Sequence, residues 1–324
     1  MNFDFWKYGS VKCKDTAKGM GEQLKTQRQY TFVRRCRICA RNSGFIGYLL
    51  LLLVFWGCTT MPELDIEAPN DLIVVDGVIE QGRQSRVFVT RNAPYFSSID
   101  SAGLRDLVLS RAKVTLTDGE QSEVLILRRD NRFFPPFYYA GNEIIGEIGK
   151  EYTLYVSYGG KSVRAMTSIP EPVDIDSVWF ELDAGEDSIG SIQIKFTDPL
   201  EAKNYYRIFT MVQGEEDKFN SAFIIAIDDQ FFNGKDISFR LYRAPESFLA
   251  TDESGNFMLG DTVLLKLSTM DEQTFNFWNT YQEEVINATN PFASSMINLE
   301  SNVEGQGLGV WSGYGASRDT VICQ

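Results

Sequence analysis

The chain has 324 residues, 44% of them hydrophobic, a formal net charge of −13 and no histidine. Its length and apolar fraction suit one large or two ordinary globular domains, so disorder of the whole chain is not expected. The absence of histidine excludes Ser-His-Asp and Cys-His catalysis, H-E-x-x-H zinc sites and a histidine general base. Carboxylates, Lys, Tyr, a Ser-Lys pair or a metal held by oxygen ligands remain as catalytic routes.

The charge is unevenly distributed along the chain. Residues 1–57 carry ten Lys or Arg and three Asp or Glu, which leaves 21 basic and 41 acidic residues in the other 267. A body with a net charge of −20 repels phosphate backbones, so nucleic acid is not expected as a partner.

The first distinctive segment is an uncharged, largely apolar run of thirteen residues, 45–57, that ends at Cys58 and follows four arginines (Arg34, Arg35, Arg37 and Arg41). A membrane-spanning helix needs about 20 residues, whereas the apolar region of a signal peptide has roughly 7–15. The junction Gly57-Cys58 resembles the lipobox of bacterial lipoproteins, although Phe55 and Trp56 stand where smaller residues are usual. We expect residues 1–57 to be a lipoprotein signal and Cys58 to be lipidated; an uncleaved anchor and a buried structural element are the alternatives.

Residues 58–70 are polar, acidic and contain proline, which predicts a short tether. If Cys58 is lipidated, Cys323 has no partner within the exported chain, so the fold depends on its core rather than on disulfides.

Short β-branched segments bounded by turn residues follow the tether and predict strands at 72–79, 86–90, 113–117, 124–127, 152–156 and 162–166. Gly159-Gly160 supplies the positive φ angles of a tight hairpin. At least six strands in about 100 residues without a helical period indicate a β-sandwich domain over residues 71–170.

The segment Ile169-Pro170-Glu171-Pro172 cannot lie inside a central strand, so we place a domain boundary there. Further strands are predicted at 176–182, 192–196, 205–211, 222–227, 237–241 and 262–267. A capping-box pattern at Ser268 and Thr269, with aromatic residues at helical spacing after it, predicts one helix at about 270–287. The predicted fold is therefore mainly β, with two tandem β-sandwich-like domains, the second of which (171–324) carries this helix.

A series of short motifs runs along the exported chain in a fixed order: Val75-Asp76-Gly77, Arg111 to Leu116, Gly149-x-x-Tyr152-x-Leu154, Ile169-Pro170 with Val173 to Ser177, Asp198-Pro199 before Asn204 to Arg207, Asp228-Asp229 before Phe232-Asn233-Gly234, and Asn302-x-x-Gly305-x-Gly307-x-Gly309-Val310. With the lipidated leader, this order resembles the outer-membrane lipoprotein family catalogued as domain of unknown function 4249. The resemblance covers essentially residues 58–324.

This resemblance implies an outer-membrane lipoprotein that accompanies a TonB-dependent receptor, a β-barrel that imports nutrients too large for porins. It also implies that the first domain is Ig-like or transthyretin-like. The family has no known activity, so it supplies no catalytic residues.

The densest aromatic segment is Arg128 to Tyr139, in which two prolines would stiffen a loop. Aromatic rings on a loop can anchor a partner or stack on a sugar, so Phe133, Phe134, Phe137 and Tyr138 are the candidate binding residues. Packing in the core is the alternative, because residues 137–140 also fit a strand.

Other patterns indicate structure rather than chemistry. Gly305-Gln306-Gly307-Leu308-Gly309 lacks the strand-loop-helix context of a phosphate loop and predicts a turn before a final strand at Val310-Trp311. The acidic groups at Asp183, Glu186 and Asp187 and at Asp228 and Asp229 do not have calcium-loop spacing. We therefore predict no metal site, no cofactor and no catalytic residue.

Together these features lead to the hypothesis of a non-enzymatic, lipid-anchored outer-membrane protein that binds an unidentified small molecule or glycan for uptake through a TonB-dependent receptor. Two alternatives stay open: a surface glycan hydrolase that uses paired carboxylates, and a structural or adhesive envelope protein.

Overall fold

The computed structural model describes residues 72–92, 103, 106–243, 255–288 and 299–324. Residues 66–324 form one compact unit, and the fold below is that of this unit. The predicted signal at 1–57, Cys58 and the tether at 58–70 lie outside the described residues.

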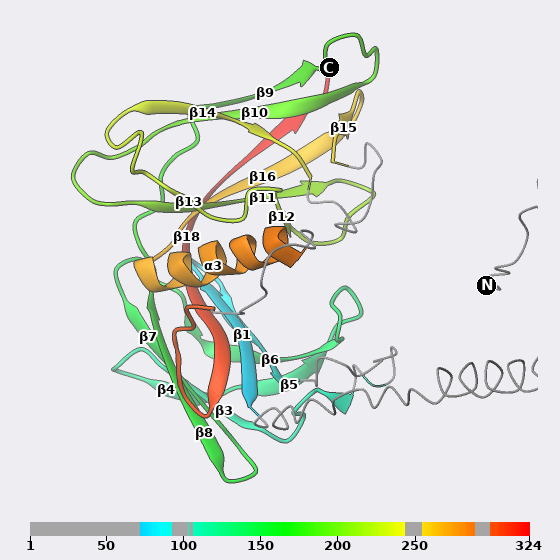
Figure 1. Ribbon diagram of the computed structural model, residues 1–324. Helices are drawn as coiled ribbons and strands as arrows, with labels where there is room; N and C mark the ends of the chain where they lie inside the picture. The colour runs from blue at the N-terminus through cyan, green and yellow to red at the C-terminus, as the bar shows by residue number, and fades with distance from the viewer. Residues whose placement is uncertain (1–71, 93–102, 104–105, 244–254, 289–298) are drawn as a thin grey trace, which may run out of the picture. The chain divides into compact units, whose positions relative to one another are not determined.

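Mainly β structure is confirmed, with one long helix among the described residues (Figure 1). The helix is α3 (Glu272–Ala288). The strands are β1 (Ile73–Glu80), β2 (Gln84–Arg91), β3 (Lys113–Thr117), β4 (Ser122–Val124), β5 (Ile126–Arg129), β6 (Phe137–Ile145), β7 (Glu151–Tyr158), β8 (Lys161–Ser168), β9 (Ser177–Leu182), β10 (Ile189–Thr197), β11 (Tyr205–Val212), β12 (Asn220–Ser221), β13 (Ile227–Asp228), β14 (Asp236–Leu241), β15 (Phe257–Met258), β16 (Thr262–Thr269), β17 (Val303–Gly305) and β18 (Gly307–Ile322).

The largest sheet has nine strands, in the order β12-β11-β16-β18-β1-β2-β6-β5, with β13 paired beside β11. Its central strand is the 16-residue β18, which pairs in parallel with β1 through its first half and antiparallel with β16 through its second half. Figure 1 shows β18 running through both the lower and the upper part of this unit. The last strand of the chain therefore joins the strands of its two halves into one sheet.

Two smaller sheets lie against the two ends of the large one. The five-stranded sheet β17-β8-β7-β3-β4 encloses a core that includes Val75, Leu116, Leu154 and Trp311. The four-stranded sheet of β14, β10, β15 and β9 encloses a second core, which includes Ile194, Ile208, Leu265 and Val321. Since Trp311 and Val321 both lie on β18, this one strand contributes to both cores.

Strand alternation assigns the two faces of the large sheet. Successive side chains of a strand point to opposite faces, so the odd-numbered residues Trp311 and Val321 of β18 face the cores and its even-numbered residues face away from them. On that opposite face Tyr314 packs in a third cluster with Trp278 and Phe275 of α3. The helix therefore lies on the side of the sheet that the two smaller sheets leave uncovered.

Glycines in β18 permit close contact with the segment that links the two halves of the chain. A Cβ atom on Gly313 would lie 2.2 Å from the carbonyl oxygen of Ser168, and one on Gly315 would lie 2.2 Å from that of Pro170. Any larger residue would push this linking segment away, because real Cβ atoms do not approach a backbone oxygen so closely. These glycines thus hold residues 168–170 against the central strand.

The predicted strands are largely confirmed, and the predicted helix at about 270–287 is confirmed as α3. The strand expected at 222–227 is wrong: only the two-residue β12 and β13 form beside that segment, and their partner is β11. The strand expected at 124–127 is divided, because β4 and β5 belong to different sheets and the intervening Leu125 is buried in the core. The expected glycine turn before the last strand is shorter than predicted, since Gly307 and Gly309 are already part of β18.

The domain boundary expected at residue 170 stays a prediction. The two core clusters do separate near this position in the sequence, but Val303 and Trp311, from the end of the chain, complete the first one.

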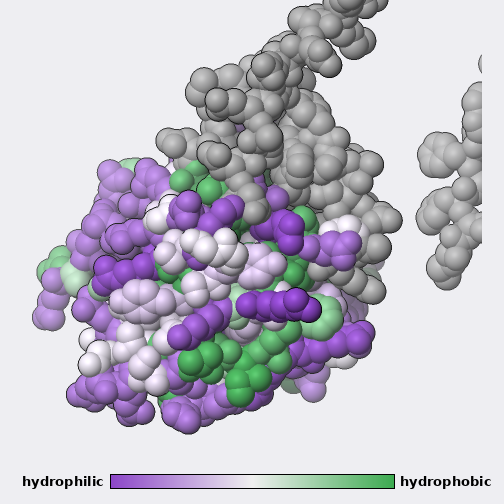
Figure 2. All heavy atoms as spheres, turned by 90° about the horizontal axis from the view of Figure 1, so that it is seen from below, coloured by the Kyte–Doolittle hydropathy of each residue, from purple (hydrophilic) through white to green (hydrophobic). Residues whose placement is uncertain are grey.

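No helix in the described part of the chain is long and apolar enough to cross a membrane. The face seen in Figure 2 is largely hydrophilic, with small apolar areas between the polar side chains.

Candidate functional site

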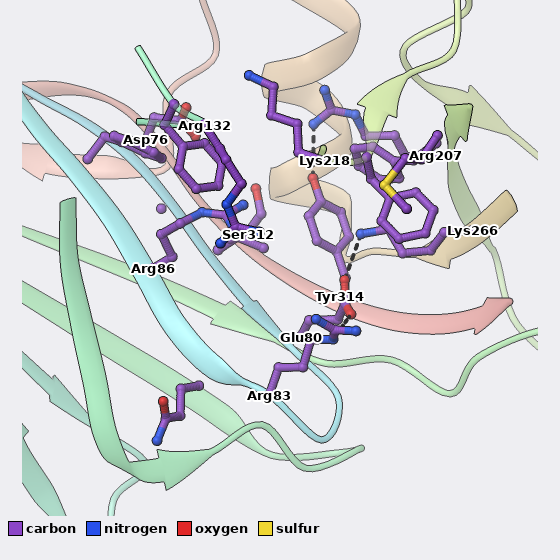
Figure 3. A pocket seen from close by; sticks show the side chains of 18 of the residues that line it. Asp76, Glu80, Arg83, Arg86, Arg132, Arg207, Lys218, Lys266, Ser312 and Tyr314 are labelled. Carbon is purple, nitrogen blue, oxygen red and sulfur yellow. Dashed lines mark hydrogen bonds and ion pairs between the residues drawn. The ribbon is translucent and has the colours of Figure 1, made fainter. Parts of the chain in front are cut away.

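The uncovered face of the large sheet carries a pocket of about 460 Å³. Its floor is made by side chains of five adjacent strands, β11, β16, β18, β1 and β2. Trp278 of α3 and two loop segments, at 132–133 and 217–219, form the walls (Figure 3). This volume lies within the range of small-molecule sites, about 300–1,000 Å³.

The pocket reverses the charge balance of the exported chain. Seven of its lining residues are basic and three are acidic: Arg83, Arg86, Arg132, Arg207, Lys218, Lys266 and Arg318 against Asp76, Glu80 and Asp217. In residues 58–324, by contrast, acidic residues outnumber basic ones by 41 to 21. The basic lining is therefore a local feature, which attracts anions in an otherwise acidic protein.

Glu80, on β1, is the centre of one charge cluster in the pocket. Its carboxylate accepts a 2.7 Å hydrogen bond from Nζ of Lys266, contacts Arg318 and lies 3.0 Å from Nε of Arg83. Lys266 is only 8% exposed, and its ammonium group lies 4.2 Å from the ring centre of Phe209. Each charge in this cluster has an opposite charge in contact.

The pKa values around Glu80 reflect this pairing. Burial acts to raise the pKa of the Glu80 carboxyl, but the charges of Lys266, Arg318 and Arg83 outweigh it and hold the pKa below the ordinary value. Burial lowers the pKa of Lys266, and the contact with Glu80 opposes that effect. The cluster is thus most stable with Glu80 ionised and Lys266 paired to it.

Asp76 lies on the same face of β1, four residues before Glu80, in a different electrostatic environment. Its side chain is open to the pocket, and no hydrogen bond or ion pair joins it to any described residue. Protein nevertheless surrounds it, and this enclosure raises the pKa of its carboxyl in spite of the opposing charges of Arg207 and Arg86. Asp76 is therefore an accessible acid between two arginines that it does not contact.

Arg86, on β2, is opposite Val78 in the sheet and projects into the pocket beside Asp76 (Figure 3). Its guanidinium carbon lies 4.5 Å from the ring centre of Phe133, and its buried Nε has no hydrogen-bond partner. It forms no ion pair with any described carboxylate. Burial lowers the pKa of this guanidinium and the charge of Asp76 opposes the shift.

Arg207, on β11, reaches the pocket from the side opposite Arg86 in the strand order. It is 7% exposed, its guanidinium carbon stands 3.6 Å from a ring centre of Trp278, and one of its terminal nitrogens donates a 3.1 Å hydrogen bond to the hydroxyl of Tyr314. Its Nε is buried without a partner. Like Arg86, it is stacked on an aromatic ring rather than paired with a described acid.

Residues 60–320 match the family model described as a domain of unknown function (DUF4249). The chain belongs to this family. No curated protein matches it. The family membership expected from the ordered motifs is thereby confirmed, and because the matched residues include every residue that lines the pocket, the site is part of the DUF4249 domain.

The four aromatic residues predicted to bind have different positions in this DUF4249 domain. Phe133 lines the pocket and packs edge-on against Phe88 and Tyr138. Phe134 is 57% exposed and is not among the lining residues, while Phe137 and Tyr138 lie in β6, opposite Arg129 and Arg128 of β5. The structure therefore brings only Phe133 to the pocket, and its binding role stays a prediction.

The acidic groups that were expected to be structural lie outside the pocket. Asp229 accepts a hydrogen bond from the backbone of Asn204, and Asp183 belongs to the hairpin between β9 and β10. Among the described residues, no group of three or more Cys, Asp or Glu side chains is arranged to hold a metal ion. Cys58 lies outside the described residues.

Sequence reasoning missed most of the pocket, namely Asp76, Arg86, Arg207 and Lys266. The available signal was a charged residue inside an apolar strand segment, as in Ile73-Val74-Val75-Asp76 and Leu264-Leu265-Lys266-Leu267. Such a residue marks the uncovered face of a strand that is otherwise buried. That these particular charges meet depends on the pairing of β1 with β18, which joins residues more than 230 positions apart.

Proposed function

We propose that this DUF4249 protein is a non-enzymatic binding protein of the outer membrane. It is anchored by lipid on Cys58, captures a ligand in the pocket of the large sheet, and works with a TonB-dependent receptor in nutrient uptake. The signal-like segment ending at Gly57-Cys58 supports the anchor, and the acidic body supports a location away from nucleic acid.

The single observation that carries the binding proposal is the open pocket with unpaired arginines. Burying or enclosing a guanidinium without a carboxylate costs free energy, so a fold retains such groups where they meet a partner that is not part of the chain. Arg86 and Arg207 both fit this description, because each borders the pocket and neither pairs with a described acid. The pocket is therefore better suited to ligand capture than to a purely structural role.

The paired-carboxylate hydrolase is the weaker alternative. A glycosidase needs two carboxyl groups about 5–9.5 Å apart on either side of the sugar. Asp76 and Glu80 lie four residues apart on one strand, a backbone separation of about 13 Å. Glu80 is also held by three cations, which keep its pKa low and unsuited to a general acid.

The anchor is tested by mass spectrometry of the native protein extracted from membranes. We expect the mature chain to begin at Cys58 with acyl groups attached, and a Cys58→Ser variant to leave the membrane fraction. An unmodified chain that retains residues 1–57 would contradict the proposal.

The receptor partnership is tested by co-purification in mild detergent. We expect a TonB-dependent barrel to accompany the anchored protein and to be lost from the Cys58→Ser variant. Repeated absence of any barrel would count against uptake and favour the structural or adhesive alternative.

A further inference from the structure

The composition of the pocket indicates the charge of its ligand. Acidic residues are about twice as common as basic ones in residues 58–324, so the chain as a whole has an excess of carboxylates. Seven basic and three acidic residues nevertheless line it. A cationic ligand would meet net repulsion there, whereas an anion would offset the excess positive charge.

The unpaired cations are arranged in two places. Arg86 lies against Phe133, where Nζ of Lys218 is also 5.5 Å from the same ring centre, and Lys218 has no ion pair among the described residues. Arg207 lies instead against Trp278 of the helix wall. Three strands, β16, β18 and β1, separate the strand of Arg207 from that of Arg86. Since neighbouring strands lie about 4.8 Å apart, a single small acidic group does not account for both. Figure 3 shows the two arginines on different sides of Tyr314.

The other four basic residues of the pocket already have an acidic partner. Arg132 pairs with Asp130 at 2.6 Å, and Lys266, Arg318 and Arg83 all contact Glu80. Only Arg86, Arg207 and Lys218 therefore remain to bind a charged ligand among the seven basic residues of the lining. A guanidinium stacked on a ring can still donate N–H bonds from its edge to a carboxylate or phosphate. In Arg207 one terminal nitrogen already donates to Tyr314, which leaves the other for a ligand.

We infer that the pocket binds a small organic anion with at least two acidic groups, one contacting Arg86 and Lys218 and the other contacting Arg207. Asp76, between the two arginines, faces the middle of such a ligand and accepts or donates a hydrogen bond there. The inference rests on the proposed function in one respect only, that this pocket is the ligand site.

The test is a charge series on one carbon skeleton, measured by calorimetry with the full-length protein in detergent. Tricarballylate, glutarate and butyrate carry three, two and one carboxylates, and pyrophosphate provides a phosphate probe. We expect affinity to rise with the number of acidic groups, by roughly tenfold or more from butyrate to the better of tricarballylate and pyrophosphate, and to fall with added NaCl. Which of these two binds more tightly distinguishes carboxylate from phosphate ligands.

Variants assign the contacts. Arg86→Gln and Arg207→Gln should each weaken the preferred polyanion by roughly 10–100-fold, the effect of losing a charge-assisted hydrogen-bonded contact. If Arg207→Gln fails to fold, Arg207→Lys replaces it. This variant keeps the charge but not the guanidinium group, so it should lose part of the affinity. Arg240→Gln, on exposed β14 outside the pocket, should bind like the wild type.

Equal affinity for butyrate and tricarballylate, no binding of either polyanion, or unchanged binding by both arginine variants would overturn the inference. These results are independent of the membrane anchor and the receptor. Polyanion binding without a co-purifying barrel would retain the inference and refute the uptake role, whereas a co-purifying barrel with a pocket that rejects polyanions would do the opposite.

Discussion

Asp76 and Glu80 are both acids on the same face of β1, with Val78 between them, yet their surroundings differ. Glu80 contacts three cations and its pKa lies below the ordinary value. The Asp76 side chain has no hydrogen bond or ion pair with the described residues, and its pKa lies above the ordinary value. The comparison separates charges that are paired within the fold from charges that are left without a partner, within a single pocket.

The largest effect is expected from breaking the paired cluster. Glu80→Gln leaves Lys266, which is 8% exposed, without a counter-charge, so the free energy of unfolding should fall by about 3–5 kcal/mol. Urea unfolding at pH 7.5 measures this change. Glu181→Gln is the matched control, because Glu181 is half exposed, lies 3.7 Å from Arg240 and should contribute under about 1 kcal/mol. A similar loss in both variants would refute a special role for Glu80.

Removing both members of the buried pair should cost much less than removing one. In a Glu80→Leu, Lys266→Met double variant no buried charge is left unpaired, and apolar replacement of such pairs is often neutral within about 1–2 kcal/mol. Arg318 and Arg83 stay partly exposed and reach water. Urea unfolding should therefore place the double variant closer to the wild type than Glu80→Gln. Additive losses would show that Arg318 and Arg83 also depend on Glu80.

The sequence predicted the strands that make these clusters but not the clusters themselves. Alternation of apolar and polar residues and Gly159-Gly160 predicted the hairpin of β7 and β8, and the helical spacing of aromatic residues predicted α3, because these signals are local. The capping expected at Ser268 and Thr269 is wrong: both residues belong to β16, and Asp271 caps the helix by accepting a hydrogen bond from the backbone N–H of Thr274. The strand expected at 222–227 was wrong because this apolar segment makes only isolated backbone pairs: Ala222 with Arg243 at one end and Ile227 with β11 at the other.

The site was largely beyond prediction because it is made by long-range pairing. Val75-Asp76-Gly77 was recognised as a motif, but its chemistry depends on Arg207 from β11 and Ser312 from β18, which only the order of the sheet brings near. Phe133 was found because a dense aromatic loop is visible locally. Arg86 was not, because a strand arginine is ordinarily a solvated residue.

The unpaired arginines should affect stability far less than Glu80. Arg86→Gln removes an enclosed charge that has no described carboxylate partner, so the free energy of unfolding should change by at most about 1 kcal/mol, the size of the lost cation–π contact. Urea unfolding tests this, with Glu80→Gln measured beside it. A loss of unfolding free energy comparable to that of Glu80→Gln would indicate that Arg86 stabilises the fold as Glu80 does.

The smallest effect, and the most diagnostic, is expected at Asp76. Enclosure raises the pKa of its carboxyl above the ordinary 3.8. Ionising Asp76 therefore costs free energy in the folded protein but not in the unfolded chain. Asp76→Asn should therefore raise the melting temperature at pH above the raised pKa. The difference should shrink as pH falls through that pKa and vanish below 3.8, where the wild-type acid is protonated in both states.

The charged groups that line the pocket with Asp76 are two acids, Glu80 and Asp217, and seven bases, Arg83, Arg86, Arg132, Arg207, Lys218, Lys266 and Arg318. Asp236→Asn supplies the control of opposite sign, because the hydrogen bond from Lys195 lowers the pKa of that exposed carboxyl. Its loss should reduce stability slightly at neutral pH, with the difference again fading in acid. Thermal unfolding from pH 3 to 8 would compare the two. A lower melting temperature for Asp76→Asn at pH 7.5 would mean that the arginines already hold Asp76 as a carboxylate, and the pocket would then be self-neutralised rather than open to an anion.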